Sequence, residues 1–266
     1  MIQKMLTSAC VAGLVAGLLA AVLHFAFVQK LILLGETYET GAAVHFAGVA
    51  PATDDHAAGA AHSHDATATD DHAAIAGEDA SPVTRNAFTV LFSGVVYVAY
   101  ALMLVAGFGL AAVYGKTITA RDGLLWGIAG FAAFQLAPAM GLSPELPGTM
   151  AADLGARQVW WWGTALATAT ALGLIGYGRG PLPLVAAAVL LVAPHVIGAP
   201  QLDGFSGVSP PELASAFSAR VLGVGLAVWA VLGWTAGGLA ALAALGYLAS
   251  TVLPQQVAGL LQQGAG

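Results

Sequence analysis

MLTSACVAGLVAGLLAAVLHFAFV, residues 5–28, contains no charged side chain. As a helix its 24 residues rise about 36 Å, enough to cross a hydrocarbon core of roughly 30 Å. A cleaved secretory signal is the alternative, since Lys4 precedes the run and small residues fill it. The apolar part of a signal is about 7–15 residues long, and no clear cleavage site followed by polar chain is present. The run therefore predicts a first transmembrane helix.

Uncharged apolar runs of similar length recur along the chain, at residues 88–113, 123–142, 159–177, 181–199 and 221–250. The run at 181–199 is the weakest, because Pro181, Pro183, Pro194 and His195 fall within it. Only 8% of the residues are charged, whereas a soluble domain is about a quarter charged. We predict an all-α fold, a polytopic integral membrane helical bundle with five or six transmembrane helices and a flexible His/Asp-rich loop after the first.

This prediction divides the chain into four parts: a first transmembrane helix at 1–28, a polar loop at 29–87, a helical bundle at 88–250 and a short tail at 251–266. The start of the loop could extend the first helix or lie at the membrane interface. The final run is about 45 Å long as a straight helix, so it should tilt or break near Gly237–Gly238.

Small residues recur at a spacing of four in three of the predicted helices, which would let neighbouring helices approach closely. These residues are Ala9, Gly13, Gly17 and Ala21; Gly107, Ala111 and Gly115; and Gly233, Gly237 and Ala241. The alternative is that glycine and alanine are merely abundant, with 34 glycines in the chain.

Within the predicted loop, residues 54–74 hold four of the seven histidines, His56, His62, His64 and His72, among aspartates, alanines and threonines. Such a composition buries too little apolar surface to order itself, so a flexible segment is expected. Imidazole and carboxylate suit divalent transition metals, and loose spacing favours weak, exchangeable binding. A solvated acidic linker that happens to contain histidine is the alternative.

Polar side chains at membrane depth are functional candidates, because burying them in lipid is costly. His24, Gln135 and His195 meet this description, although His24 could be interfacial and His195 could only hydrogen-bond at a proline kink. Glu145 lies in a Pro- and Gly-rich turn, where either ion contact or a pair with Arg157 is expected.

Several functions are excluded or disfavoured by the residues present. The chain has no basic patch for nucleic acid, no phosphate-binding loop, and a single cysteine, Cys10, so no internal disulfide is possible. An enzyme acting on a lipid or quinone would need paired catalytic residues outside the loop, and none is evident. We predict a protein that is not an enzyme, has no tightly bound cofactor, and contacts membrane lipid.

Orientation depends on Lys and Arg in short loops near the helix ends. With the amino terminus inside, four such residues fall on each side of the membrane, so the count is tied. The amino-terminal amine favours the amino terminus inside, which places the His-rich loop on the extracytoplasmic side.

The chain resembles the CbtA family of predicted cobalt transporter subunits. The resemblance rests on the first helix running into ETYETG (36–41), on GLSPELPG (141–148), on ARQVWW (156–161) and on PHVIGAP (194–200). It covers most of the chain, and a His-rich stretch after the first helix is also similar. Ser143 is a minor departure from the family pattern.

The resemblance implies uptake of cobalt, for cobalamin synthesis, across a bacterial inner membrane. It also implies a small single-span, His-bearing partner subunit of the CbtB type; a homo-oligomer is left open. From the ligand types alone, Co²⁺, Ni²⁺ and Zn²⁺ are all acceptable. The alternative function is a metal-binding membrane accessory or sensor protein without transport activity.

Overall fold

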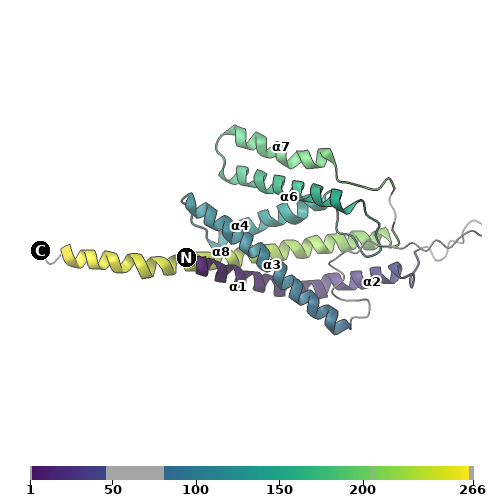
Figure 1. The fold of residues 1–266 in the computed structure, drawn as a ribbon, viewed down its shortest axis with the longest axis horizontal. Helices are drawn as coiled ribbons and strands as arrows, with labels where there is room; N and C mark the ends of the chain where they lie inside the picture. Colours follow the sequence, from purple (N-terminus) through teal and green to yellow (C-terminus); the bar gives the residue numbers. More distant parts are fainter. Residues whose placement is uncertain (1, 46–80, 205–206, 264–266) are drawn as a thin grey trace, which may run out of the picture.

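A computed structural model describes residues 2–45, 81–204 and 207–263, and this part of the chain is helical, with no strand (Figure 1). In chain order the elements are α1 (Ile2–Leu23), the π-helical η1 (His24–Val28), α2 (Gln29–Glu39), α3 (Pro82–Val113), α4 (Ala120–Phe131), the π-helical η2 (Ala132–Leu136), α5 (Ala137–Ala139), α6 (Leu154–Tyr177), α7 (Pro181–Ile197) and α8 (Pro211–Gln263). The all-helical prediction is confirmed for these residues.

Three helices are long and apolar enough to cross a membrane, at Met5–Glu39, Pro82–Val113 and Pro211–Ala243. Helix α7 is a shorter apolar helix of the same character. The chain is therefore a membrane protein by length and composition, while the number of five or six spans stays a prediction.

The helices pack in an order that places α8 at the centre. Helix α1 lies along α3 and α8, and α4 packs closely against residues 229–237 of α8 (Figure 1). Helix α6 joins this core through η2, α5 and α4, and among the described elements α7 packs against α6 alone. The α6–α7 hairpin is thus the most peripheral part of the bundle.

The first helix continues beyond the predicted boundary at residue 28. It passes through η1 into α2 without a break, and no proline lies within it. The apolar side of α2 packs with Val28 against Leu146, Leu213 and Phe217. Of the two expectations for this segment, helix extension is the one observed.

Helix α3 begins six residues earlier than the predicted run at 88. The Ser81 hydroxyl accepts from the Thr84 N–H and Pro82 occupies the first helical position, which together start a helix. At the far end of the chain, α8 runs as one helix through the predicted tail to Gln263. Helical structure therefore extends beyond the predicted bundle, residues 88–250, at both ends.

The predicted small-residue face of α1 makes a close contact with α3. An added Cβ at Gly13 would lie 2.7 Å from the Val98 N, and one at Gly17 would lie 2.7 Å from the Gly94 Cα, so α1 and α3 touch through their backbones. The Gly107 face meets the ring of Trp126, but its third member, Gly115, has φ +73° and lies just after the end of α3.

The α4–α8 contact is equally close. A Cβ at Gly233 would lie 2.7 Å from the Gly127 Cα, and one at Gly237 would lie 2.8 Å from the Gly123 Cα. The glycines of α8 therefore serve close approach, and the expected break near Gly237–Gly238 does not occur.

Candidate functional site

One end of the bundle, here called the loop end, gathers the carboxyl ends of α2, α5 and α7 and the amino ends of α3, α6 and α8 (Figure 1). Contacts between distant segments hold it together. The Ser218 hydroxyl donates to the Pro144 carbonyl (2.8 Å), the Gln201 amide donates to the Gly141 carbonyl (2.8 Å), and Thr149 and Gly207 form an isolated bridge.

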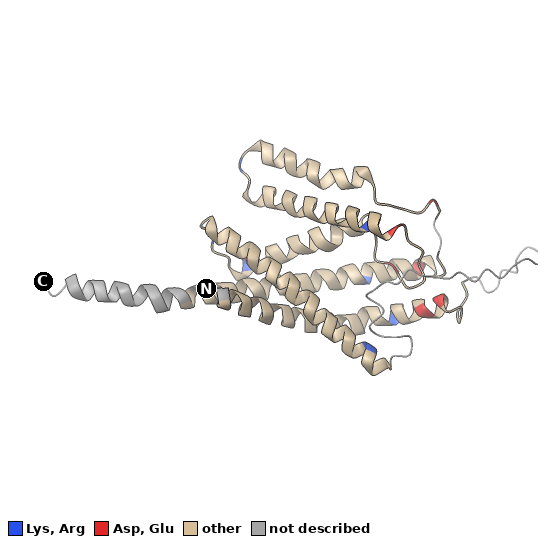
Figure 2. Ribbon diagram, viewed as in Figure 1, with Lys and Arg blue, Asp and Glu red and all other residues tan. Residues whose placement is uncertain are grey.

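The loop end carries nearly all the acidic side chains of the described chain (Figure 2). By their positions in or between these elements they are Glu36, Glu39, Glu145, Asp153, Asp203 and Glu212. The opposite end has Asp122 together with Lys116, Arg121 and Arg179. The loop end also carries Lys30, Arg85, Arg157 and Arg220, two of which pair with Glu36 and Glu145, so its described residues have only a small excess of acidic charge.

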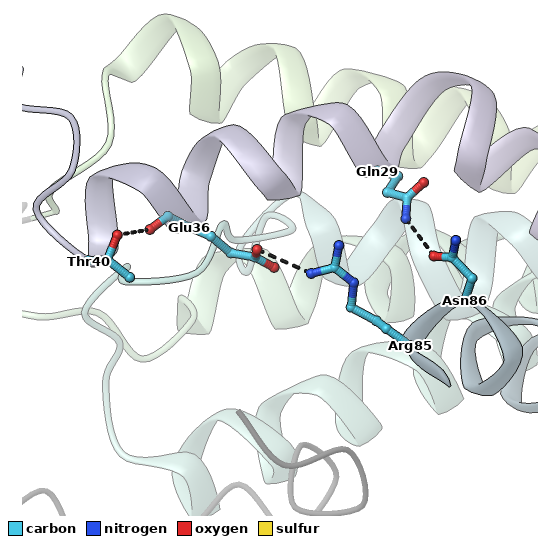
Figure 3. Close-up of polar contacts among 5 residues, drawn as sticks. All are labelled: Gln29, Glu36, Thr40, Arg85 and Asn86. Carbon is cyan, nitrogen blue, oxygen red and sulfur yellow. Dashed lines mark hydrogen bonds and ion pairs between the residues drawn. The ribbon is translucent and has the colours of Figure 1, made fainter. Parts of the chain in front are cut away.

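Polar contacts join the two described segments that border the His-rich loop (Figure 3). Gln29 Nε2 donates to Asn86 Oδ1 (2.8 Å), and Arg85 Nη1 lies 3.4 Å from Glu36 Oε2. Thr40 Oγ1 donates to the Glu36 carbonyl (2.9 Å) near the end of α2. The predicted ligands His56, His62, His64 and His72 lie outside the described residues, so their binding stays a prediction.

Glu145 forms the ion pair that we gave as one of its two expected roles. Arg157 Nη2 lies 2.7 Å from Glu145 Oε2, and the pair is partly exposed. The neighbouring carboxylate, Asp153, accepts from the Ala156 N–H and starts α6. Contact of Glu145 with an ion stays a prediction, and such an ion would compete with the guanidinium.

His195 lies in the last turn of α7, one residue after Pro194. Helix α7 is not broken at the proline but ends three residues later, where Gly198 takes φ +84°. The Pro194 carbonyl accepts from Trp160 Nε1 (3.1 Å) and from the Gly198 N–H (3.0 Å). The His195 ring lies edge-on to Trp160, with centroids 6.1 Å apart. Trp160, which we had not predicted for this role, therefore satisfies the carbonyl beside the histidine.

The three consecutive tryptophans do not share one face of α6, because successive helical side chains point about 100° apart. Trp160 contacts His195, Trp161 packs near Phe134 with centroids 6.1 Å apart, and Trp162 is the exposed member. Trp160 and Trp161 connect the surroundings of His195 with η2.

His24 begins the π-helical segment η1, in which the Gln29 N–H bonds to the His24 carbonyl. Arg220 Nη1 of α8 donates to the Phe27 carbonyl in the same segment (3.1 Å). Short π-helical segments occur frequently at functional sites. Neither η1 nor the Arg220 contact was expected, although Arg220 stands out as the last charged residue before a long apolar run.

Gln135 lies in the second π-helical segment, η2, and its amide is packed against Gly225 of α8. Its Oε1 is buried and has no hydrogen-bond partner among the described residues. Within those residues, no three His, Cys, Asp or Glu side chains form a group that could hold a metal ion. The predicted ligands His24, Gln135, Glu145 and His195 therefore stand as separate positions on different elements.

A comparison with family models matches residues 2–255 to a family described as "Probable cobalt transporter subunit (CbtA)". No curated protein and no solved structure matches the chain. The match covers all the described helices except the end of α8.

Proposed function

The chain belongs to the CbtA family of probable cobalt transporter subunits, and from this premise we propose that it takes up a divalent transition-metal ion, Co²⁺ foremost, across the bacterial inner membrane. The family match over residues 2–255 is the observation that carries the proposal. The three long apolar helices agree with it. The chain itself acts as a transporter subunit and not as an enzyme.

The ion would enter at the loop end. In this proposal His56, His62, His64 and His72 collect it, and the carboxylates of the loop end raise its local concentration. His195, Gln135 and His24 then offer single ligands at successive elements, with Glu145 at the entrance. Separate single ligands suit transport, because a complete tight site would retain the ion.

For the membrane arrangement we propose six spans. The helical segments α1–α2, α3, α4–α5, α6, α7 and α8 alternate in direction between the loop end and the opposite end (Figure 1). With the amino terminus in the cytoplasm, the loop end faces the extracytoplasmic side. A transition-metal ion arriving from outside would therefore meet the His-rich loop first.

The family description as a subunit implies a partner, and we propose a small single-span, His-bearing protein of the CbtB type. Helix α7, which packs against α6 alone among the described elements, leaves membrane-exposed surface for lipid or for such a helix. A homo-oligomer is the other assembly that this surface allows.

Uptake of radioactive Co²⁺ into vesicles that contain the purified chain, with and without the small partner, tests the function directly. Time-dependent accumulation that collapses on adding an ionophore is expected of a transporter. Binding without accumulation in both preparations would instead favour the alternative, a metal-binding accessory or sensor protein.

Replacing His56, His62, His64 and His72 by Ala should raise the Co²⁺ concentration for half-maximal uptake by roughly tenfold, since several imidazole ligands are lost. The maximal rate should stay within about twofold, because a loop that only collects ions is bypassed when metal is abundant. Initial uptake rates over a range of Co²⁺ concentrations measure both quantities. Loss of the maximal rate at saturating Co²⁺ would place the loop within the transport path.

A further inference from the structure

Three cations at the opposite end of the bundle are not neutralised by the described protein. Lys116 lies between α3 and α4, Arg121 in the first turn of α4, and Arg179 between α6 and α7 (Figure 2). All three residues are exposed, and none of their side chains forms a hydrogen bond or ion pair with another described residue. Their charges are therefore available to an external anion.

The acidic side chain that the described chain has at this end is already engaged. Asp122 Oδ2 accepts from the Thr119 N–H (3.0 Å) and from the Thr119 hydroxyl (2.7 Å), which completes the capping box of α4. From residue 221 to the end of the chain the sequence has no charged residue, so α8 adds no carboxylate beyond that point. The described residues of the opposite end thus carry an excess of positive charge.

The cations of the loop end are arranged differently. Arg85 and Arg157 form ion pairs with carboxylates at 3.4 Å and 2.7 Å, and Arg220 donates to the Phe27 carbonyl (3.1 Å). Three of the four cations there are therefore held by the protein itself. The absence of such contacts among the described residues is a property of the opposite end.

Helix stability does not explain the charge of Arg121. The first turn of a helix carries the positive end of the macrodipole, so it favours an acidic side chain and disfavours a cation. Helix α4 begins at Ala120, and Asp122 supplies the favourable carboxylate in the same turn. A cation between these two residues calls for an anion outside the helix.

The other two cations each follow an exposed tyrosine at a helix end. Tyr114 comes directly after α3 and Tyr177 ends α6, and the sequences YGK (114–116) and YGR (177–179) place the cation two residues later. Helix α3 is one of the long apolar helices and ends at residue 113. Tyrosine favours the membrane interface, where its ring lies among apolar chains and its hydroxyl among head groups. The following cation should therefore lie at the level of the lipid phosphates.

Aromatic contacts join the helix ends that carry these residues. Trp126 Nε1 of α4 donates to the Tyr177 hydroxyl of α6 (3.1 Å), and the Phe108 ring of α3 lies edge-on to Trp126, with centroids 5.4 Å apart. The loop between α3 and α4 and the loop between α6 and α7 therefore belong to one surface of the bundle (Figure 2).

We propose that the opposite end is a docking surface for the head groups of anionic phospholipids such as phosphatidylglycerol. Lys116, Arg121 and Arg179 attract the phosphates, and the rings of Tyr114 and Tyr177 pack among the adjoining acyl chains. The tyrosines place these cations at the surface of the bilayer, so lipid is the partner and not a soluble anion. The proposal does not depend on the uptake function.

The deciding variant is Lys116→Gln/Arg121→Gln/Arg179→Gln in the full chain, because glutamine keeps a polar side chain and removes the charge. Thermal unfolding is measured in nanodiscs of phosphatidylcholine alone and of an equimolar mixture with phosphatidylglycerol. The mixture should raise the melting temperature of the wild type by about 4 °C or more. The triple variant should lose most of this rise, and NaCl at about 1 M should reduce the rise in the wild type.

Lys30→Gln/Arg85→Gln/Arg157→Gln is the matched control, because it removes the same number of cations from the loop end. Each protein is compared with itself in the two lipid preparations, so a general loss of stability cancels. The control should keep the rise that phosphatidylglycerol causes. An equal loss in both triple variants would mean that only net charge matters, and this would overturn the proposal.

A wild-type chain that melts at the same temperature in both lipid preparations would also overturn it and leave these cations for another partner. If the triple variant does not fold, Arg179→Gln alone decides the question, since the residue is exposed in a loop. It should lose about a third of the rise, as one of three cations. An undiminished rise would remove Arg179 from the surface and overturn the proposal.

Discussion

Gly233→Val should remove most of the folded protein from the membrane. A Cβ at this position would overlap the Gly123 carbonyl and lie 2.7 Å from the Gly127 Cα. Both atoms belong to the backbone of α4. Backbone cannot rotate aside as a flexible side chain can, and α4 must separate from α8. We expect a destabilisation of about 3 kcal/mol or more, at or beyond the upper end of ordinary overpacking. Size-exclusion of a fluorescent fusion and thermal unfolding in detergent would measure the loss.

Gly223→Val is the matched control on the same helix. No heavy atom outside the helix's own neighbours lies within 4 Å of a Cβ added at Gly223, and the residue is exposed. The same β-branched side chain therefore carries the same helix-propensity penalty there without a backbone clash. Equal abundance and melting temperature for the two variants would mean that the α4–α8 contact does not hold the bundle together.

The spacing of glycine and alanine predicted which helix faces carry small side chains, but not which helices pack against each other. Gly233 and Gly237 stand out by their spacing in the final run. Their partners Gly123 and Gly127 belong to a run in which we had noted only a length sufficient to cross the membrane. A spacing of four marks a face that permits close approach. The choice of partner depends on the arrangement of all the helices, which local spacing does not contain.

The helix boundaries, too, could be predicted from the sequence only in part. Ser81 and Pro82 form a recognisable start signal, and reading it would have placed the beginning of α3 correctly. The π-helical segments η1 and η2 carry no comparable signal, although Pro138 explains part of the second. Their positions depend on contacts with α8, such as the Arg220 bond to the Phe27 carbonyl.

Among the candidate site residues, polarity within an apolar run was a sufficient reason to select Gln135 and His195. The surroundings that define their chemistry could not be predicted. Gln135 Oε1 packs against Gly225 and has no hydrogen-bond partner among the described residues, and the carbonyl beside His195 accepts a bond from Trp160 of α6. Both facts are properties of helix pairs that are distant in the sequence.

His195→Ala should lower maximal Co²⁺ uptake per molecule by about tenfold or more if the imidazole is a ligand on the path, since alanine offers no donor atom. Trp160 Nε1 and the Gly198 N–H bond to the Pro194 carbonyl, so this carbonyl does not require His195; the carbonyl that loses its helical donor to the proline is that of Leu190, four residues earlier. The protein should therefore reach the membrane in normal amounts.

Trp160→Phe separates the structural contribution from the transport contribution at this position. It keeps an aromatic ring beside His195 and removes the N–H that bonds to the Pro194 carbonyl, which should destabilise the protein by about 1 kcal/mol. Its uptake, normalised to the amount of protein in the membrane, should stay near the wild-type value. His195→Ala should show the reverse, with normal abundance and low uptake, and His195→Gln should restore a part of it through the amide oxygen. Normal uptake per molecule by the His195→Ala protein would remove the imidazole from the path and leave Gln135, deeper in the bundle, as the first ligand after the loop.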